Sequence, residues 1–563
     1  MLTALGRRGQ AILSTFCWRG MASRRGSAQD LMILWEDMLG QAQKASLDQA
    51  QVENNLSEGR SSAASRARSL IQKSAMHIPQ GDIPQQVHTS LVQCYNKLPS
   101  MASKIWLCQL LADELGTQRG AVDEAVKHWL ALNQEPLNKQ QQQAHVPAAD
   151  AILRVAANLS VAAQPLYVRL FHAIAQEKGG ICFLVRLRAD VLDSLADQPA
   201  FRAPLRAFSE NLRQALAAWF TPGLLALERV SWNSSAELLH KVMYNEAVHP
   251  MRGWEDLKRR LCEDRRVHVF FHPCLPGEPL VILHCALVNG EPCRDMHQLL
   301  GVQPPSRILG TAQSSGAPNA TDTAQQQPST AMFYSISTTQ RGLAGIDLGK
   351  FLIKQVADSV KREFPSISTF ATLSPVPGFR QWLLSRLLAE DLQHGDRSEE
   401  VSVLQQPAYP PFISKAEASE LILSLQAMPS MNELLHPVNK VSCFTLLHTM
   451  LHDGIWMQPQ CAHVHELFKH ILMRNAARYL VLEKRRNLAL DPVANFHFRN
   501  GAEIQSINWL SDTSEQGLAR SFGICVNYVY KLERVYDNNR MYLVEHKIQA
   551  SKEVAEWLRP TNG

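Results

Sequence analysis

The chain has 563 residues, 45% of them apolar and 19% charged, which is close to the composition of an ordinary globular protein. This excludes a chain disordered throughout, and no apolar run reaches the roughly 18 residues that would predict a membrane span. The net charge is +5, and the five arginines of residues 1–29 account for it, because the remainder has 52 basic and 52 acidic side chains. Because basic and acidic side chains are equal in number outside residues 1–29, a nucleic acid partner is not expected.

Residues 1–29 contain arginine and serine but no acidic side chain, a composition typical of an organelle transit peptide. A frayed basic tail is the alternative interpretation. We expect the mitochondrial matrix, with the cytoplasm or another organelle as alternatives. The chain ends in Arg-Pro-Thr-Asn-Gly, so peroxisomal import through a C-terminal Ser-Lys-Leu is not supported.

Residues 30–221 are expected to form an all-helical domain. Apolar residues recur at three- and four-residue spacing along this stretch, and strand-like alternation is rare. The region carries no catalytic motif, and a helical module of this kind usually packs against another domain or assembles subunits. Thr221-Pro222-Gly223 then interrupts the pattern, so we place a domain boundary there.

Residues 222–563 are expected to form a mixed α/β domain. Two β-rich runs, 266–272 and 279–287, flank Pro276-Gly277 and predict a hairpin. A Pro-, Ser- and Gln-rich insert follows at 303–330 and predicts a surface segment. Residues 380–485 read as a helical insertion, and the last 70 or so residues return to strands before a closing helix. The predicted fold class is therefore α+β, with a helical domain before a mixed catalytic domain.

The strand, turn and helix predicted across 331–364 are the most informative local feature. A glycine-bearing turn before a helix exposes backbone N–H groups to an anion, and Gly342, Gly345 and Gly349 would let a phosphate approach. The spacing fits neither a Walker A loop nor a GxGxxG fingerprint. It resembles the pyrophosphate loop of the GNAT-type acetyltransferase fold, although an unliganded turn is the simpler alternative.

Two further segments place reactive side chains in restrained settings. In the segment ATLSPVPGF, two prolines and a glycine form a stiff turn that fixes the direction of Ser374. In PVANFHFRNG, His497 lies between two phenylalanines, and a histidine in apolar surroundings can stay neutral near pH 7 and exchange a proton. Each segment alone is also consistent with an ordinary turn or a buried core histidine.

No metal site is predicted. His465 and His470 are five residues apart, one too many for an HExxH zinc site, and His448 and His452 have the right spacing without an acidic partner. The eleven cysteines include no CxxC pair, which indicates free thiols rather than a disulfide framework or a zinc ribbon.

Taken together, the sequence blocks resemble the malonyl-CoA decarboxylase family from about residue 175 to 555. The blocks include GGICFLVRLRADVL, EAVHP, FYSISTTQRGLAGIDLGKFLIKQV, LSPVPGF, PVANFHFRNGAEIQSINW and NYVY. The resemblance implies an oligomer-forming helical domain and a GNAT-like catalytic domain. It implies conversion of malonyl-CoA to acetyl-CoA and CO₂ without a cofactor, in fatty acid metabolism, by a homo-oligomer for which a tetramer is one consistent assembly.

The resemblance also implies roles for particular residues. Ser374 and His497 correspond to the catalytic pair, with His497 protonating an enolate, and Tyr530 and Asp347 to supporting residues. The segment that would bind CoA comprises Ala344, Gly345, Ile346, Asp347, Leu348, Gly349 and Lys350. Asp347 departs from the glutamate common at its position, which leaves its contact open. The alternatives are a GNAT-type acyltransferase acting on an amine and a non-catalytic CoA-binding scaffold.

Overall fold

The computed structural model describes residues 83, 85–134, 145–197, 203–302, 327–346, 348, 352–394, 412–426 and 443–559. The predicted targeting segment 1–29, and residues 303–326 of the predicted insert, lie outside the described residues. The chain divides into two compact units. One holds Met1–Trp219 together with Gln340–Ile346, and the other holds Phe220–Thr339 and Asp347–Gly563.

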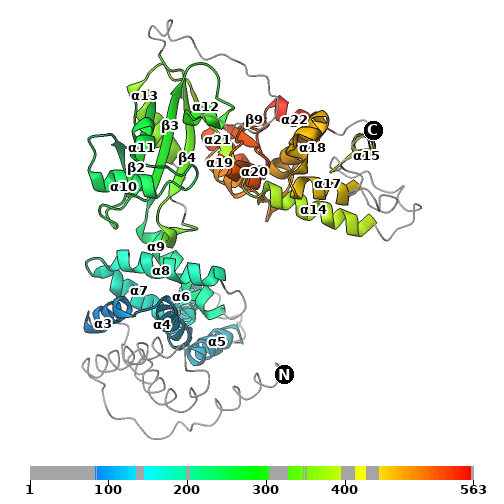
Figure 1. Cartoon of the computed structure of the whole chain (residues 1–563). Helices are drawn as coiled ribbons and strands as arrows, with labels where there is room; N and C mark the ends of the chain where they lie inside the picture. The colour runs from blue at the N-terminus through cyan, green and yellow to red at the C-terminus, as the bar shows by residue number, and fades with distance from the viewer. Residues whose placement is uncertain are drawn as a thin grey trace, which may run out of the picture. The chain divides into compact units, whose positions relative to one another are not determined.

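The first unit is helical wherever it is described, which confirms the periodicity read from the sequence (Figure 1). Its core brings together large side chains of two helices, with the rings of Tyr167 and Phe171 of α7 at centroid distances of 4.9 and 5.0 Å from Phe208 of α9. The helices are α3 (Gln85–Lys97), α4 (Met101–Glu114), α5 (Arg119–Gln134), α6 (His145–Ala163), α7 (Leu166–Gln176), α8 (Gly180–Asp197) and α9 (Ala203–Trp219).

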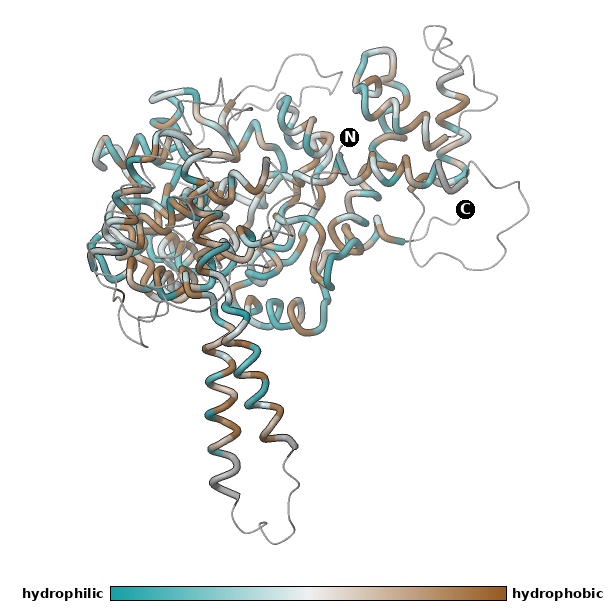
Figure 2. Tube along the Cα trace, turned by 90° about the horizontal axis from the view of Figure 1, so that it is seen from below, coloured by the Kyte–Doolittle hydropathy of each residue, from teal (hydrophilic) through white to brown (hydrophobic). Residues whose placement is uncertain are grey.

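Helices α5 and α6 form a hairpin that packs chiefly on itself (Figure 2). Both helices carry exposed apolar residues. The exposed fractions are 51% for Leu130, 45% for Ile152, 67% for Leu153 and 51% for Val161. Among the described helices, none alone is long and apolar enough to cross a bilayer. Residues 150–163 and 166–176 reach that limit only as a pair bent by 81°.

The segment Gln340–Ile346 belongs to the helical unit, although it lies far from the unit's other residues in sequence. Its short 3-10 helix η2 (Arg341–Leu343) packs on α8. Buried Arg188 of α8 donates from Nη1 to the carbonyl of Gly342 at 2.5 Å and from Nε to the carbonyl of Ser209 at 3.2 Å. The carbonyl of Val185 is so close that a Cβ on Gly342 would lie 1.9 Å from it.

The second unit is built on one mixed sheet. The strand order is β1-β2-β3-β4-β5-β10-β6, and β9 pairs with β10. The predicted hairpin is confirmed, because β2 and β3 pair antiparallel. The strands are β1 (Ala226–Val230), β2 (Arg265–Phe271), β3 (Val281–Val288), β4 (Thr330–Thr338), β5 (Thr369–Thr372), β6 (Ser374–Pro375), β9 (Glu503–Asn508) and β10 (Cys525–Val529).

The one parallel pair in this sheet is β4 with β5, joined through α13 (Leu352–Glu363). Their register runs from Thr330–Thr369 to Phe333–Thr372 and stops there, while β4 continues to Thr338. The remainder of β4 pairs only with β3. The strand and the helix predicted within 331–364 are confirmed by β4 and α13, while residues 347 and 349–351 of the predicted turn lie outside the described residues.

Helices cover both faces of the sheet. Leu239 of α10 (Ala236–Tyr244) and Leu257 of α11 (Trp254–Arg260) pack against Val267 and Val269 of β2. Glu363 of α13 instead pairs with Arg266, whose side chain points to the opposite face because neighbouring residues of a strand alternate. Met296 and Leu299 of α12 (Met296–Leu300) pack with Cys525 of β10 in a second apolar cluster.

The region predicted as a helical insertion carries α14 (Phe379–His394), α15 (Lys415–Gln426), α17 (Cys443–His452) and α18 (His465–Val481). Residues 395–411 and 427–442 of this region lie outside the described part. The remaining helices of the unit are α19 (Pro492–Arg499), α20 (Glu515–Ser521), α21 (Val535–Val544) and α22 (Lys552–Glu556). The closing helix is therefore shorter than the 548–558 predicted from the sequence.

We expect Gly342→Ala to destabilise the helical unit, because the new methyl group would overlap the Val185 carbonyl. Overpacking of this kind typically costs about 1–3 kcal/mol. Thermal unfolding of the two proteins measures it. The matched control is Gly120→Ala in α5, where a Cβ meets nothing within 4 Å. Equal melting temperatures for Gly342→Ala and Gly120→Ala would contradict the described packing of η2.

Candidate functional site

Ser374 and His497 are 123 positions apart in sequence and meet in the folded second unit. Ser374 Oγ lies 3.0 Å from His497 Nε2, within hydrogen-bond distance. Ser374 is 7% exposed and His497 is 3% exposed, so both are close to fully buried. This arrangement can hold or move a proton between a hydroxyl and an imidazole.

Local structure fixes each partner. Ser374 begins the two-residue strand β6, where it pairs with Val526 of β10, so a strand edge holds it in addition to the proline-rich turn. His497 lies on α19, which starts with Pro492 at its first position. The carboxylate of Asp491 caps α19 by accepting the backbone N–H groups of Val493 and Ala494 at 3.0 and 2.8 Å.

Two tyrosines of the NYVY block contact the ring of His497. The imidazole stacks on the ring of Tyr528 with a centroid distance of 4.3 Å and an interplanar angle of 22°. Its Nδ1 lies 2.7 Å from the hydroxyl of Tyr530. Burial lowers the pKa of His497 to about 3, and burial raises the pKa of Tyr530 well above its usual value. Both groups are therefore neutral at physiological pH in the free protein.

Sequence reasoning missed the other partner of Ser374, which is Thr372. Ser374 Oγ donates to Thr372 Oγ1 at 3.0 Å, and Thr372 is 1% exposed. The same threonine oxygen accepts the backbone N–H of Tyr528 at 3.3 Å. Thr372 stands two residues before Ser374 in the quoted ATLSPVPGF segment, but nothing in that segment shows that a hydroxyl there would face the serine. Tyr528 was missed for the same reason.

The predicted CoA-binding segment is described only in part. Asp347, Gly349 and Lys350 lie outside the described residues. Gly345 has a φ of +77°, a left-handed conformation that suits glycine, and its carbonyl accepts from Arg213 at 3.4 Å. Ala344 and Ile346 accompany it in the helical unit, and Leu348 is buried in the second unit.

The histidine pairs weighed as metal ligands do not form metal clusters. Among the described residues, no group of three or more His, Cys, Asp or Glu side chains is placed to hold a metal ion. His448 and His452 stack with ring centroids 5.6 Å apart. His465 donates from Nε2 to the backbone carbonyl of Trp456 at 2.8 Å.

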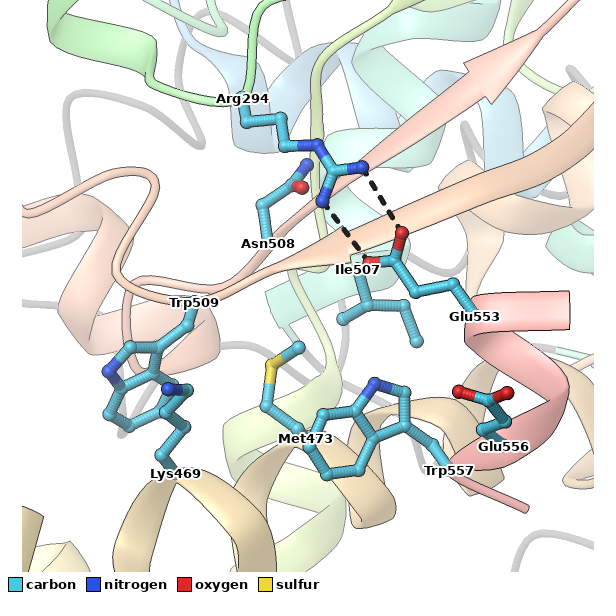
Figure 3. Close-up of a pocket in the computed structure, with 9 residues that line it drawn as sticks. All are labelled: Arg294, Lys469, Met473, Ile507, Asn508, Trp509, Glu553, Glu556 and Trp557. Atoms are coloured by element: carbon cyan, nitrogen blue, oxygen red, sulfur yellow. Dashed lines mark hydrogen bonds and ion pairs between the residues drawn. The ribbon is translucent and has the colours of Figure 1, made fainter. Parts of the chain in front are cut away.

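A pocket of about 540 Å³ lies elsewhere in the second unit (Figure 3). Neither Ser374 nor His497 lines it. Trp509 and Trp557 form part of its wall, and Arg294 pairs with Glu553 at 3.1 Å across one side. Its remaining lining residues are Lys469, Met473, Ile507, Asn508 and Glu556.

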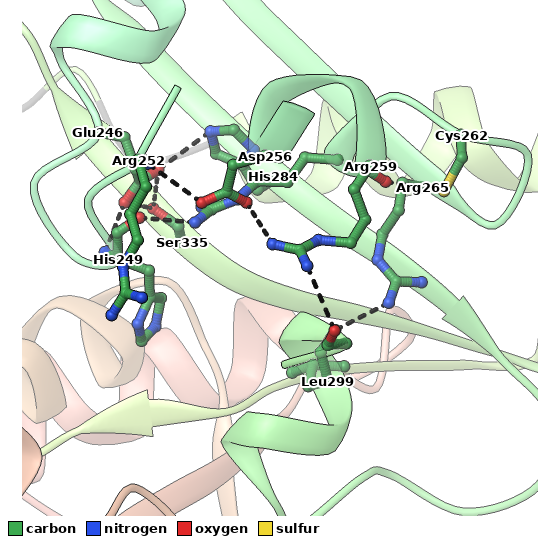
Figure 4. A network of polar contacts seen from close by, with 12 residues as sticks. Glu246, His249, Arg252, Asp256, Arg259, Cys262, Arg265, His284, Leu299 and Ser335 are labelled. Atoms are coloured by element: carbon green, nitrogen blue, oxygen red, sulfur yellow. Dashed lines mark hydrogen bonds and ion pairs between the residues drawn. The ribbon is translucent and has the colours of Figure 1, made fainter. Parts of the chain in front are cut away.

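A second buried polar cluster anchors the EAVHP segment to β3 and β4 (Figure 4). Glu246 Oε2 lies 3.0 Å from His284 Nε2, and both side chains are fully buried. Ser335 donates to both carboxylate oxygens of Glu246 at 2.7 and 2.8 Å. Burial alone would raise the pKa of Glu246, but His284 and the hydrogen-bond donors lower it to about 2. The carboxylate is therefore charged and well satisfied, which indicates a structural anchor.

Two family models match the chain. One is described as the malonyl-CoA decarboxylase C-terminal domain and matches residues 223–563, and the other as the N-terminal domain, matching residues 116–220. The mitochondrial malonyl-CoA decarboxylase of Mus musculus is 36% identical over 82% of this chain and 83% of its own length. That of Anser anser anser is 35% identical over 83% of this chain and 82% of its own.

Solved structures agree with the sequence matches. The malonyl-CoA decarboxylase of Rhodopseudomonas palustris covers 94% of this chain and 100% of its own, at 27% identity and a TM-score of 0.60. That of Agrobacterium vitis covers 94% and 99%, at 26% identity and a TM-score of 0.59. The similarity therefore extends over both the helical and the mixed unit.

The burial of His497 predicts a pH-dependent loss of stability. Its pKa is about 3 when folded and about 6.5 in an unfolded chain, so between these values only the unfolded state takes up a proton. The free energy of unfolding therefore decreases as the pH falls below about 6.5, and at pH 5 it is lower by about 2 kcal/mol. His497→Asn should lose about that much less than the wild type between pH 7 and pH 5 in urea unfolding.

Tyr530→Phe serves as the control, because it removes a hydrogen bond but keeps the buried imidazole. It should show the full wild-type loss. Equal pH dependence in His497→Asn and the wild type would show that His497 is not held neutral in the fold.

Proposed function

Because this chain belongs to the malonyl-CoA decarboxylase family, we propose that Ser374 and His497 are the residues that carry out its reaction. The protein is an enzyme, a carboxy-lyase that converts malonyl-CoA to acetyl-CoA and CO₂. The observation that carries the assignment is the 3.0 Å approach of Ser374 Oγ to His497 Nε2.

The chemistry of the substrate explains why these groups suffice. Breaking the bond to the carboxylate releases CO₂ and leaves its electron pair on the α-carbon. The thioester carbonyl delocalises that pair as an enolate, so the substrate provides its own electron sink. The protein must hold the carboxylate, stabilise the enolate oxygen and deliver one proton. We infer that no further cofactor is required.

The proton is proposed to come from His497. In the free enzyme the imidazole is neutral, since burial keeps its pKa near 3. A bound malonyl carboxylate brings a negative charge beside the ring, and a nearby opposite charge raises a histidine pKa. His497 then takes up a proton from solvent at Nδ1 and gives the hydrogen already on Nε2 to the α-carbon, which returns the ring to its neutral form with the hydrogen on Nδ1. Ser374 donates a hydrogen bond to the malonyl group, and Tyr530 orients the imidazole through Nδ1.

CoA is proposed to bind at Ala344–Lys350, with Asp347 as a supporting residue. Three features support a GNAT-like arrangement: a parallel β4–β5 pair, pairing that stops at Phe333 and Thr372, and a glycine-bearing turn before α13. Free backbone N–H groups at the start of a helix, together with the helix dipole, favour a phosphate. The mitochondrial names of the relatives, and the basic residues of 1–29, support the mitochondrial matrix as its location.

The catalytic assignment is tested by following CO₂ and acetyl-CoA together from malonyl-CoA. We expect the wild type to release both in equal amounts. Ser374→Ala and His497→Asn should each lose about 10²–10⁴-fold in kcat, the contribution typical of a positioned proton donor. Ser385→Ala, on the exposed face of α14, is the matched control and should keep full activity.

Wild-type activity in both variants would reject this pair as the catalytic residues. Acetylation of an added amine without CO₂ release would instead favour the acyltransferase alternative. Binding of CoA with no turnover would favour the scaffold alternative.

We also propose that the enzyme is a homo-oligomer that uses the α5–α6 hairpin. The hairpin exposes several large apolar side chains on both helices, and contiguous exposed apolar surface marks interaction sites. A second copy of the chain offers the same surface in return, as a symmetric interface requires.

Charging this surface should weaken the assembly. We expect Leu130→Glu combined with Leu153→Glu to lower the mass measured by light scattering, with little change in the fold because both side chains are half exposed or more. Leu423→Glu in α15 is the control, since Leu423 is 66% exposed but lies in the other unit. An unchanged mass in the double variant would exclude the hairpin as the interface.

A further inference from the structure

We propose that Thr372 and Asn527 are positioning residues that fix the direction of the hydrogen bonds running through Ser374 and His497. This inference rests on the proposed catalytic roles of those two residues. It concerns which atoms carry hydrogens in the resting site. It assigns a function to two buried side chains that do not touch the imidazole.

The direction follows from counting donors and acceptors at Thr372. Its Oγ1 accepts the backbone N–H of Tyr528 at 3.3 Å and the hydroxyl of Ser374 at 3.0 Å, which uses both of its lone pairs. Because the Ser374 hydrogen points at Thr372, the serine oxygen presents a lone pair to His497. A neutral imidazole must then carry its hydrogen on Nε2, 3.0 Å from that oxygen.

The other side of the ring is consistent with this assignment. With the hydrogen on Nε2, Nδ1 has a free lone pair and accepts the hydroxyl of Tyr530 at 2.7 Å. The hydrogen bonds therefore run in one direction, from Tyr530 through His497 and Ser374 to Thr372. Each heavy-atom distance is between 2.7 and 3.0 Å, and all four residues are at most 7% exposed.

Asn527 holds Thr372 in place from the other face of the sheet. Asn527 alternates with Tyr528 along β10, so the two side chains point to opposite faces. Its Nδ2 donates to the carbonyl of Thr372 at 2.8 Å and to that of Cys293 at 3.0 Å. Its Oδ1 accepts from Ser506 at 2.9 Å and from Asn508 at 2.8 Å.

This set of partners also fixes the orientation of the amide. Two backbone carbonyls can only accept, and the Asn508 amide nitrogen can only donate, so the Asn527 amide fits in one orientation. Asn527 is fully buried, and both amide hydrogens and the carbonyl oxygen of its side chain have partners. A satisfied buried network of this kind is rigid, and that rigidity passes to Thr372.

The resting arrangement prepares the site for substrate. The hydroxyl hydrogen of Ser374 can turn from Thr372 to the malonyl group, while the Nε2–H of His497 stays on the serine oxygen. Without the Thr372 hydroxyl, the Ser374 hydrogen is free to turn toward His497 Nε2. The imidazole would then carry its hydrogen on Nδ1 and would donate it to Tyr530, which leaves Nε2, the nitrogen that gives the proton, without a hydrogen in the resting site.

The first test replaces Thr372 by valine, which keeps the shape of the side chain, and by serine, which keeps the hydroxyl. We expect Thr372→Val to lose about 10–100-fold in kcat, the size typical of removing a supporting partner, with KM changed less than about threefold. Thr372→Ser should recover most of the activity. Equal losses in the two variants would overturn a role for the hydroxyl.

The second test separates positioning from stability with a matched pair of buried asparagines. Asn475 of α18 is 1% exposed and donates to two backbone carbonyls, those of Phe412 and Ile471, away from the catalytic pair. Asn527→Leu and Asn475→Leu should both lower the melting temperature. Only Asn527→Leu should lower kcat when both are assayed well below their melting temperatures. Equal kcat values would reduce Asn527 to a structural residue.

The third test reads the imidazole directly and does not depend on turnover. In protein labelled with ¹⁵N-histidine, the His497 signals, identified by their loss in His497→Asn, should report hydrogen on Nε2 in the wild type and on Nδ1 in Thr372→Val. The same tautomer in both proteins would overturn the proposal. If Ser374→Ala keeps full turnover, the catalytic assignment fails, while this measurement still decides whether Thr372 sets the hydrogen-bond direction.

Discussion

The proposed catalytic site depends on the burial of one histidine whose two ring nitrogens both have partners. His497 loses its contact with water, and that loss lowers its pKa to about 3. A buried polar ring is costly unless its nitrogens are hydrogen-bonded, and here a tyrosine and a serine satisfy them. The ring is therefore held in one place and in its neutral form. The capping of α19 by Asp491 and the stacking on Tyr528 also fix the position of the ring.

A single strand organises most of this site. Along β10 and the residue that follows it, Asn527, Tyr528 and Tyr530 perform different tasks on opposite faces. Tyr528 supports the imidazole ring, and its backbone N–H contacts Thr372. Asn527 faces the other way and ties together β5, β9 and the loop at Cys293. Because β10 pairs with β5, β6 and β9, a displacement of this strand would disturb every one of these contacts at once.

The sequence predicted the elements with strong local patterns. The hairpin of β2 and β3, the helices described between 85 and 219, and the β4–α13 unit follow from periodicity and turn residues. Ser374 and His497 were singled out because the segments around them resemble those of the decarboxylase family, since each segment alone is also consistent with an ordinary turn or a buried core histidine. Thr372 and Asn527 were not, because their roles depend on strand pairing across more than 150 residues, which no local pattern reveals. The buried pair of Glu246 and His284 was missed for the same reason, since two separate segments must fold together before the two side chains meet.

The assignment of Gln340–Ile346 to the helical unit bears on how such a protein can evolve. The two family models divide the chain near residues 220–223, yet neither structural unit is a continuous stretch of sequence. A recombination event at that boundary would bring residues 340–346 together with a foreign α8, and the Gly342 carbonyl would lose the guanidinium of Arg188. Domains are exchanged freely only where few contacts cross the junction. The two halves are thus expected to be inherited together, and substitutions on α8 are expected to be matched by substitutions in residues 340–346.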